Sequence, residues 1–273
     1  MLFPKQLADM SFVYTPTPGS FASVCNLTGD TNPVHRECAC AQKYGLEDVV
    51  MPGMQMLTLA EVAVKAMYPR MAGLHLTSVT MRNMAPAYPS RDLQFIVAET
   101  GNDGLECEIG VGIFDDATKK QKADFRFTYS SANGGVRPEV PQELRHVTDL
   151  TSEYPVRLLD ACELNQEQLG KLKERTGFTE ADLVMGTAAL PFTSGYLMKR
   201  ADPEEMDGRK IVYMGFGAKI FPFDWRGRDI GVYCVSGAER RRKKGTGTII
   251  VSPVTMSIGD KVFAEVKTTL FVE

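Results

Sequence analysis

The sequence predicts an α+β fold made of two similar halves, each with a helical segment followed by a run of antiparallel strands. The order of helix and then strands occurs in residues 1–131 and again in residues 152–273. The strand regions of the halves overlay with a period of about 135 residues, because Pro86 precedes Arg91-Asp92 as Pro222 precedes Arg228-Asp229. This self-similarity predicts a duplicated module.

In the first half, residues 53–68 form the clearest predicted helix. Met54, Leu57 and Val62 recur near helical spacing, and Pro69 ends the pattern. The segment is apolar on most sides, so we expect it to be deeply buried. A shorter helix is expected at residues 19–27. Segments with period-two or β-rich character predict strands at residues 10–15, 76–81, 92–98, 105–113 and 123–129.

The second half repeats this order after a longer lead-in. Residues 132–151 contain Asn133-Gly134-Gly135 and two prolines, which predict a linker. An exposed amphipathic helix is expected at residues 167–175. A buried helix is expected at 181–200, where Pro191 and Gly195 shorten or kink it. Strands are expected at residues 210–220, 229–235, 246–251 and 261–272.

The composition limits the class of protein. The chain has 273 residues, 44% hydrophobic residues and a net charge of −3, values typical of a globular protein and unlike a general nucleic-acid binder. No apolar run reaches the length of a membrane span, and the N-terminus lacks the apolar stretch of a signal peptide. Six scattered cysteines are expected to be free thiols. We therefore expect a cytoplasmic protein without membrane or nucleic-acid partners.

A polar turn provides the candidate chemistry. Asp30, Asn32 and His35 place a carboxylate, an amide and an imidazole within six residues. An Asp and a His together can transfer protons to and from a substrate near neutral pH. Asp, Asn, Gly and Pro are also common turn formers, so the alternative is a turn with no catalytic role.

Gly53 provides a second candidate, because it stands at the start of the predicted buried helix. A glycine there lets a ligand approach free N–H groups at the positive end of the helix dipole. Such N–H groups suit the oxygen of a thioester carbonyl. The alternative is a simple Pro52-Gly53 turn before a helix.

These segments together resemble a known family. Phe21-Ala22, Gly29-Asp30-x-Asn32-Pro33-x-His35 and Gly53 are similar to the MaoC-like (R)-specific enoyl-CoA hydratases and 3-hydroxyacyl dehydratases. The resemblance implies a double hotdog fold, in which each long helix is wrapped by an antiparallel sheet and the two sheets join. It also implies that Asp30 and His35 are the catalytic pair, that the Gly53 N–H holds the thioester oxygen, and that Asn32 supports them.

The sequence departs from the family at three places. Met51-Pro52 precedes Gly53 where many relatives have a histidine, and Ala60-Glu61 stands where relatives often have a serine. The second half has no histidine beyond residue 151 and no copy of the motif. We therefore expect residues 152–273 to be a degenerate hotdog and each chain to hold one active site.

The resemblance implies a carbon–oxygen lyase of fatty acid metabolism. It would interconvert trans-2-enoyl and (R)-3-hydroxyacyl thioesters of coenzyme A or of acyl carrier protein, without a metal or redox cofactor. Two alternatives stay open: a hotdog thioesterase, and a non-catalytic protein that binds acyl chains or partner proteins. The sequence does not determine the oligomeric state, and a homodimer is one arrangement that it allows.

A basic run in the second half has two interpretations. It comprises Arg240, Arg241, Arg242, Lys243 and Lys244. The first interpretation is a solvated hairpin tip. The second is contact with the phosphates of coenzyme A or with an acidic carrier protein.

Overall fold

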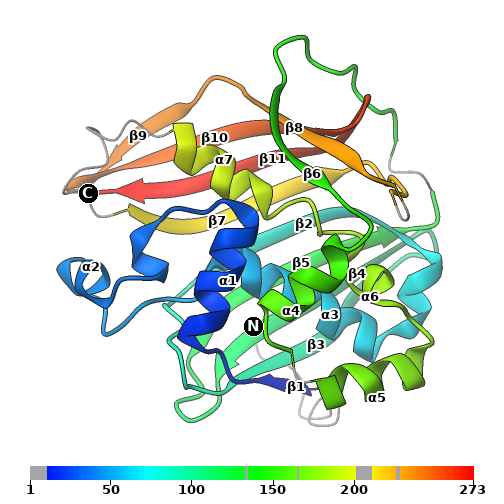
Figure 1. The fold of residues 1–273 in the computed structure, drawn as a ribbon, viewed down its shortest axis with the longest axis horizontal. Helices are drawn as coiled ribbons and strands as arrows, with labels where there is room; N and C mark the ends of the chain where they lie inside the picture. Colours follow the sequence, from blue (N-terminus) through cyan, green and yellow to red (C-terminus); the bar gives the residue numbers. More distant parts are fainter. Residues whose placement is uncertain (1–10, 133–134, 165, 201–210, 226–227) are drawn as a thin grey trace.

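One antiparallel sheet of eleven strands organises the molecule (Figure 1). The computed structural model describes residues 11–132, 135–164, 166–200, 211–225 and 228–273. The strands run in the order β1-β3-β4-β5-β2-β7-β11-β10-β8-β6, with β9 paired to β10. Their bounds are β1 Ser11–Tyr14, β2 His75–Asn83, β3 Leu93–Asn102, β4 Glu106–Asp115, β5 Gln121–Ser130, β6 Arg145–Leu150, β7 Ile211–Ile220, β8 Ile230–Ser236, β9 Arg240–Lys244, β10 Gly247–Ile258 and β11 Lys261–Val272.

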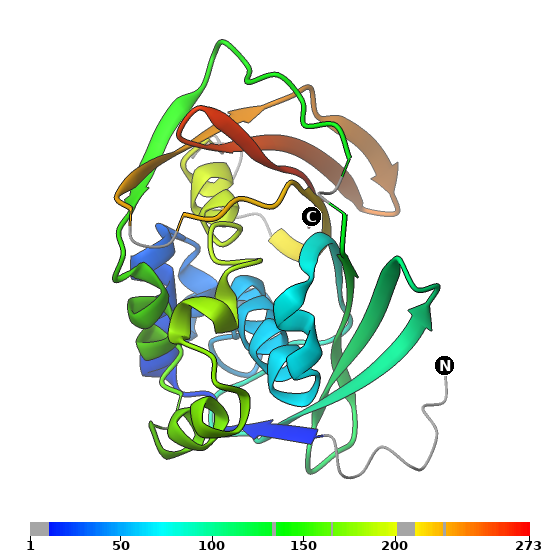
Figure 2. The same cartoon turned by 90° about the vertical axis from the view of Figure 1, so that its right-hand side faces the viewer.

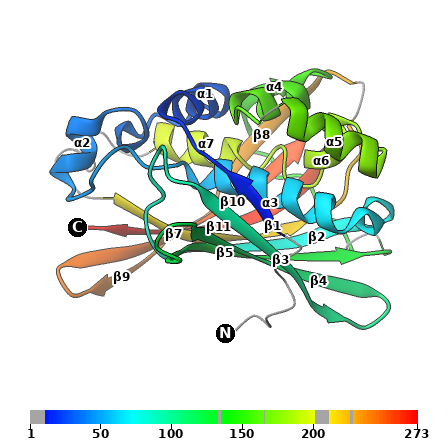
Figure 3. The same cartoon turned by 90° about the horizontal axis from the view of Figure 1, so that it is seen from below.

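The helices gather on one side of this sheet (Figure 3). They are α1 Pro18–Thr28, α2 Cys38–Lys43, α3 Gly53–Met67, α4 Tyr154–Ala161, α5 Gln166–Thr176, α6 Glu180–Val184 and α7 Phe192–Arg200, with short 3-10 helices η2 Pro33–His35 and η3 Pro69–Gly73. The core lies between the helices and the sheet, so any pocket there is lined by both layers.

The two halves of the chain meet where β2 pairs with β7. This pairing is antiparallel, from Ser78 opposite Lys219 to Arg82 opposite Gly215. Going outward from it, β5, β4, β3 and β1 follow β2 in the same spatial order as β11, β10, β8 and β6 follow β7. The halves are therefore related by an approximate twofold axis through the β2–β7 pair, which agrees with the predicted duplication.

Helix α3 is the central helix of the first half, and strands of the sheet wrap around it (Figure 2). Every residue between its first and last is buried. Strand β5 shows why the sheet covers this helix: Phe125, Phe127 and Tyr129 alternate with more exposed residues, so one face of the strand is apolar. Each such side chain taken out of water contributes about 1.5–3 kcal/mol.

The structure differs from the sequence prediction in the second half. The helix predicted at 181–200 is divided into α6 and α7, because the chain turns before Pro191. Residues 145–150, inside the predicted linker, form β6 and pair with β8, so the linker ends earlier than predicted. The basic run is not a hairpin tip: it forms β9, and the turn comes after it, at Gly245. Predictions made on residues 1–10, 133–134 and 210 lie outside the described residues.

Candidate active site

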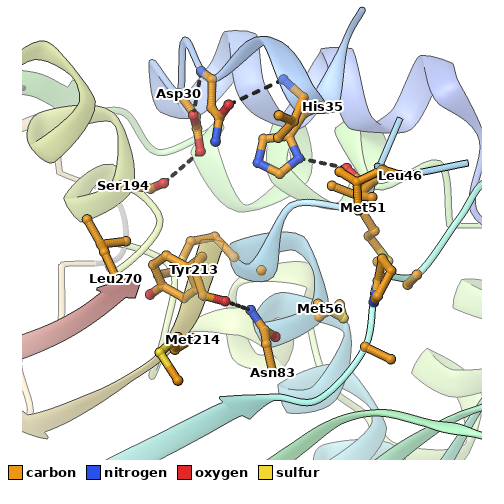
Figure 4. Close-up of a pocket in the computed structure, with 18 of the residues that line it drawn as sticks. Asp30, His35, Leu46, Met51, Met56, Asn83, Ser194, Tyr213, Met214 and Leu270 are labelled. Carbon is orange, nitrogen blue, oxygen red and sulfur yellow. Dashed lines mark hydrogen bonds between the residues drawn. The ribbon is translucent and has the colours of Figure 1, made fainter. Parts of the chain in front are cut away.

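A cavity of about 310 Å³ lies between the two halves (Figure 4). The loop after α1, the start of α3, the end of β2, helix α7 and the start of β7 enclose it. It is lined by Asp30, Asn32, Val34, His35, Tyr44, Leu46, Val50, Met51, Gly53, Met54, Met56, Asn83, Met84, Ala85, Pro86, Ala87, Ser194, Met198, Tyr213, Met214 and Leu270. The structure therefore brings Asp30, Asn32, His35 and Gly53, the four predicted site residues, to one cavity. Residues of the second half, from α7, β7 and β11, complete its lining.

The order of residues in the motif explains its local shape. Gly29 ends α1 with φ 72°, a left-handed conformation that suits glycine. The side chain of Asn32 then caps η2 by accepting a hydrogen bond from the Val34 N–H at 3.3 Å. Pro33 follows at the first helical position, where its missing N–H is not needed. This loop holds Asp30 and His35 at the cavity wall.

Asp30 is buried, with 5% of its surface exposed, and both of its carboxylate oxygens accept hydrogen bonds. Oδ1 accepts from the Asn32 N–H at 2.9 Å, and Oδ2 accepts from the Ser194 hydroxyl at 2.6 Å (Figure 4). The Arg36 guanidinium donates to the backbone oxygen of Asp30 at 2.9 Å. The carboxylate is thus fixed in direction by residues of both halves.

His35 is oriented by the segment that leads into α3. Its Nδ1 lies 2.6 Å from the Val50 carbonyl oxygen. Because a carbonyl can only accept, Nδ1 carries the proton, and Nε2 holds the lone pair in the neutral ring. Figure 4 shows the other ring nitrogen turned toward the side where Asp30 and Ser194 lie. Nε2 is therefore the atom of His35 that can exchange a proton with a molecule in the cavity.

Gly53 is the first residue of α3 and lines the cavity. The first N–H groups of a helix have no partner within the helix, and no side chain caps this end. A Cβ added at Gly53 would lie 2.7 Å from the Met81 methyl group and 3.5 Å from the Tyr213 ring. Glycine therefore lets Met81 and Tyr213 pack closely against the start of α3, whose N–H groups favour a partially negative oxygen.

Two polar groups of the cavity wall were not predicted from the sequence. The Asn83 side-chain N–H donates to the Tyr213 carbonyl at 3.0 Å, which leaves Asn83 Oδ1 buried without a partner. The Tyr213 hydroxyl is also buried without a hydrogen bond of ordinary geometry. Burial, together with the nearby Asp30 carboxylate, raises the pKa of Tyr213 above its usual value. Tyr213 thus stays a neutral phenol at physiological pH.

Ser194 is a residue that sequence reasoning missed. The family resemblance placed a serine on the helix after Gly53, where Glu61 stands instead. The structure places the serine next to Asp30 from α7 of the second half. A signal was present in the sequence, because Ser194 follows Gly186 at the spacing at which Glu61 follows Gly53.

The basic run lies outside the cavity. None of Arg240, Arg241, Arg242, Lys243 and Lys244 is among its lining residues, and all five are exposed on β9. Arg241 lies opposite Ile250, Ile250 opposite Leu270, and Leu270 opposite Tyr213. Residues directly opposite share a face of the sheet, so Arg241 and Lys243 lie on the cavity face and the other three on the outer face.

The described part of the chain holds no group of three or more His, Cys, Asp or Glu side chains placed to bind a metal ion. All six cysteines are free thiols. Among the described helices, none combines the length and the apolar character that crossing a membrane requires.

Comparison with solved structures identifies the fold. A MaoC-like dehydratase matches 95% of this chain over 96% of its own, with 16% identity and a TM-score of 0.58. A MaoC-domain dehydratase protein from Chloroflexus aurantiacus gives a TM-score of 0.63 at 12% identity, over 95% of this chain and 92% of its own. A double-hotdog protein from Mycobacterium tuberculosis gives 0.53 at 13%, over 96% of both chains. The chain has a double hotdog fold.

The predicted fold class is therefore confirmed. The two hotdog sheets are continuous through the β2–β7 pair. No family model matches the sequence, and no curated protein does. At these identities the likeness to MaoC-like dehydratases concerns the fold.

Proposed function

We propose that this double hotdog protein reversibly hydrates trans-2-enoyl thioesters to (R)-3-hydroxyacyl thioesters, with Asp30 and His35 as the catalytic pair. The observation that carries the proposal is the arrangement of three groups around one cavity. These are a fixed carboxylate, an imidazole whose Nε2 is available, and the uncapped start of α3 at Gly53. An enoyl thioester needs a water activated at its β-carbon and a stabilised carbonyl oxygen.

In this mechanism the thioester oxygen lies at the Gly53 N–H, and the acyl chain lies among the methionines of the wall. Asp30 and the Nε2 atom of His35 hold one water between them. The water oxygen forms a bond to the β-carbon while one of the two residues takes a proton. Negative charge moves to the thioester oxygen, where the helix end stabilises it. The protonated residue then returns a proton to the α-carbon, which completes the addition of water.

The wall of the cavity suits an acyl chain. Met51, Met54 and Met56 are buried beside it, and Met198 and Met214 reach it from the second half. Methionine side chains are flexible and polarizable, so they adapt to apolar ligands of varied shape. The substrate class we propose is therefore an acyl thioester of coenzyme A or of an acyl carrier protein.

The phosphates of such a carrier have a candidate contact on β9. Arg241 is three strand spacings from Tyr213 on the same face of the sheet, roughly 14 Å across the strands. Arg241 also pairs with Glu239 at 3.0 Å, and Lys243 is its neighbour on this face of β9. We propose that these two residues attract the phosphates of the carrier while the acyl chain occupies the cavity.

Two further assignments belong to this proposal. Residues 1–131 form the unit with the catalytic motif, and residues 152–273 form the degenerate unit, which takes β6 as its edge strand. The six free thiols suit a reducing compartment, so we place the reaction in the cytoplasm.

The test separates hydration from thioester hydrolysis. A protein described as a thioesterase II, from Thermobifida fusca, shares the fold with a TM-score of 0.51, so hydrolysis is the rival reaction. Purified protein is incubated with crotonyl-CoA and with longer enoyl-CoAs. The enoyl absorbance and the free thiol are then followed in parallel. Hydration predicts loss of absorbance with no release of thiol. Release of thiol at the same rate would support the thioesterase, and no change in either signal would support a non-catalytic protein.

A further inference from the structure

A second cavity, of about 230 Å³, lies at the opposite end of the β2–β7 pair. It is lined by Lys65, Leu74, His75, Leu76, Tyr129, Asp182, Met185, Gly186, Ile220, Pro222, Phe223, Asp224 and Phe263. The start of β2 and the end of β7 meet there, whereas the candidate active site lies at the end of β2 and the start of β7. The twofold axis that relates the halves therefore relates the two cavities.

Individual residues follow the same relation. Gly53 faces Tyr213, which lies opposite Leu270 in the sheet. In the second cavity Gly186 faces Leu76, and Leu76 lies opposite Tyr129. Gly186 is thus the counterpart of Gly53.

The helices continue this correspondence. Ser194 and Glu61 stand at equal spacing after Gly186 and Gly53, respectively. Each of the two side chains reaches the site of the other half: Ser194 contacts Asp30, and Glu61 contacts Gly186.

The counterpart of the thioester-oxygen position is occupied by the side chain of Glu61. Its Oε1 accepts a hydrogen bond from the Gly186 N–H at 3.0 Å. Its Oε2 accepts from the Thr187 N–H at 2.9 Å and from the Thr187 hydroxyl at 2.5 Å. The Lys65 ammonium lies 3.1 Å from Oε1. Glu61 is 0% exposed, so four donors surround one buried carboxylate.

We propose that Gly186, Thr187 and Lys65 form a carboxylate-binding site that Glu61 fills from within the chain. Filling by Glu61 prevents a thioester oxygen from reaching these N–H groups, and the second cavity therefore cannot act as a second hydratase site. The part of the proposal that concerns the number of active sites rests on the proposed function. The carboxylate site itself does not.

A second observation indicates that the second cavity keeps the character of a ligand site. Tyr129 lines the cavity, and its hydroxyl is buried without a hydrogen-bond partner. Lys65 and Gly186, which both contact Glu61, also line this cavity. If the Glu61 side chain were removed, a small anion could therefore enter the vacated position through the cavity.

The test is chemical rescue of Glu61→Ala by formate, measured as the melting temperature (Tm) against sodium formate concentration. Without formate, the variant leaves the Gly186 N–H without an acceptor, while Lys65 keeps the Asp182 carbonyl and the Thr187 N–H keeps the Val184 carbonyl. The loss of the shared carboxylate should lower Tm by on the order of 10 °C. Formate should bind the four donors and restore several degrees in a saturable manner, because a ligand that binds only the folded state raises Tm. Sodium chloride at equal ionic strength should restore much less.

Two control variants define the outcomes. Glu47→Ala removes an exposed carboxylate that pairs with Arg91 at 2.8 Å, and it should show no formate-specific shift. Glu61→Gln keeps the position filled, so its Tm should not respond to formate either. If Glu61→Ala fails to fold in plain buffer, its refolding yield with and without formate gives the same comparison.

Equal responses of Glu61→Ala and wild type to formate would overturn the carboxylate site. So would a formate response of Glu61→Gln as large as that of Glu61→Ala. None of these measurements uses catalysis, so a failed hydratase assay would not affect them. A wild-type protein that binds two equivalent thioester analogues per chain would contradict the blocking role of Glu61 alone.

Discussion

At the scale of single residues, the direction of the Asp30 carboxylate depends on a hydrogen bond that crosses between the halves. The Asn32 N–H and the Ser194 hydroxyl each bind one of its oxygens, at 2.9 and 2.6 Å. Hydrogen bonds to a charged group are worth about 1.5–3 kcal/mol. Ser194 is therefore a positioning residue: it acts on a substrate through Asp30.

Replacement of Ser194 by alanine should lower kcat by roughly 10-fold or more, because Asp30 loses one of its two fixed donors. KM should change little, since the acyl chain contacts other parts of the wall. Ser194→Thr keeps the hydroxyl and should retain most of the activity. Steady-state kinetics of both variants check this. An equal loss in Ser194→Thr and Ser194→Ala would show that the hydroxyl is not what matters.

Gly53 allows the role of one backbone N–H to be isolated. Gly53→Pro removes this donor at the first helical position, where proline fits well, and the preceding residue already has the extended ψ of 134° that proline requires. Gly53→Ala adds the same Cβ near the Met81 methyl group but keeps the N–H.

If this N–H stabilises the thioester oxygen, the kcat of Gly53→Pro should be about 10²–10³-fold lower than that of Gly53→Ala. Circular dichroism would show that both variants are folded. Similar turnover of the two variants would exclude the N–H from the mechanism.

At the scale of elements, the position of α7 depends on a close contact with the end of α1. A Cβ at Gly195 would lie 2.2 Å from the Thr28 carbonyl oxygen and 2.7 Å from the Gly29 carbonyl carbon. Only a residue without a side chain lets the two helices approach this closely, and this approach brings Ser194 to Asp30.

Gly195→Ala should therefore push α7 away from α1, with a loss of roughly 5–10 °C in Tm and a loss of turnover similar to that of Ser194→Ala. Gly170→Ala is the matched control, because Gly170 lies within α5 with open space around it. That change should raise Tm slightly, since alanine favours a helix over glycine. A Gly195→Ala protein as stable as Gly170→Ala would contradict the packing described here.

The elements also show what the sequence can predict and what it cannot. Helix α3 and strands β2 to β5 follow from local signals, because Met54, Pro69 and the alternation in β5 depend only on neighbouring residues. Strand β6 lies inside the predicted linker, because a short edge strand has weak periodicity of its own. The spacing after Gly186 marks Ser194 as the counterpart of Glu61, but its contact with Asp30 spans the two halves and needs the pairing of β2 with β7.

At the scale of the whole molecule, one continuous sheet connects the basic strand β9 with the cavity. Arg241 and Lys243 share the cavity face of the sheet, and Arg242 and Lys244 lie on the outer face. All four are exposed, so their attraction for phosphates is screened by salt and worth about 1 kcal/mol or less each.

Arg241→Ser combined with Lys243→Ser should raise KM for a coenzyme A thioester severalfold at low salt and leave kcat nearly unchanged. The matched pair, Arg242→Ser with Lys244→Ser, removes the same charge from the other face and should have a smaller effect. An N-acetylcysteamine thioester, which lacks the phosphates, should respond to neither pair. If both pairs raise KM equally, or neither does, β9 is only a solvated strand.

The most direct measurement is the rate of hydration of crotonyl-CoA by the wild type, by Asp30→Asn, by His35→Ala and by the double variant. We expect each single change to lower turnover by about 10²–10⁴. The turnover of the double variant should fall by a factor far smaller than the product of the two single reductions, because both residues act on one water. Wild-type turnover in either single variant would contradict the assignment of Asp30 and His35 as the catalytic pair.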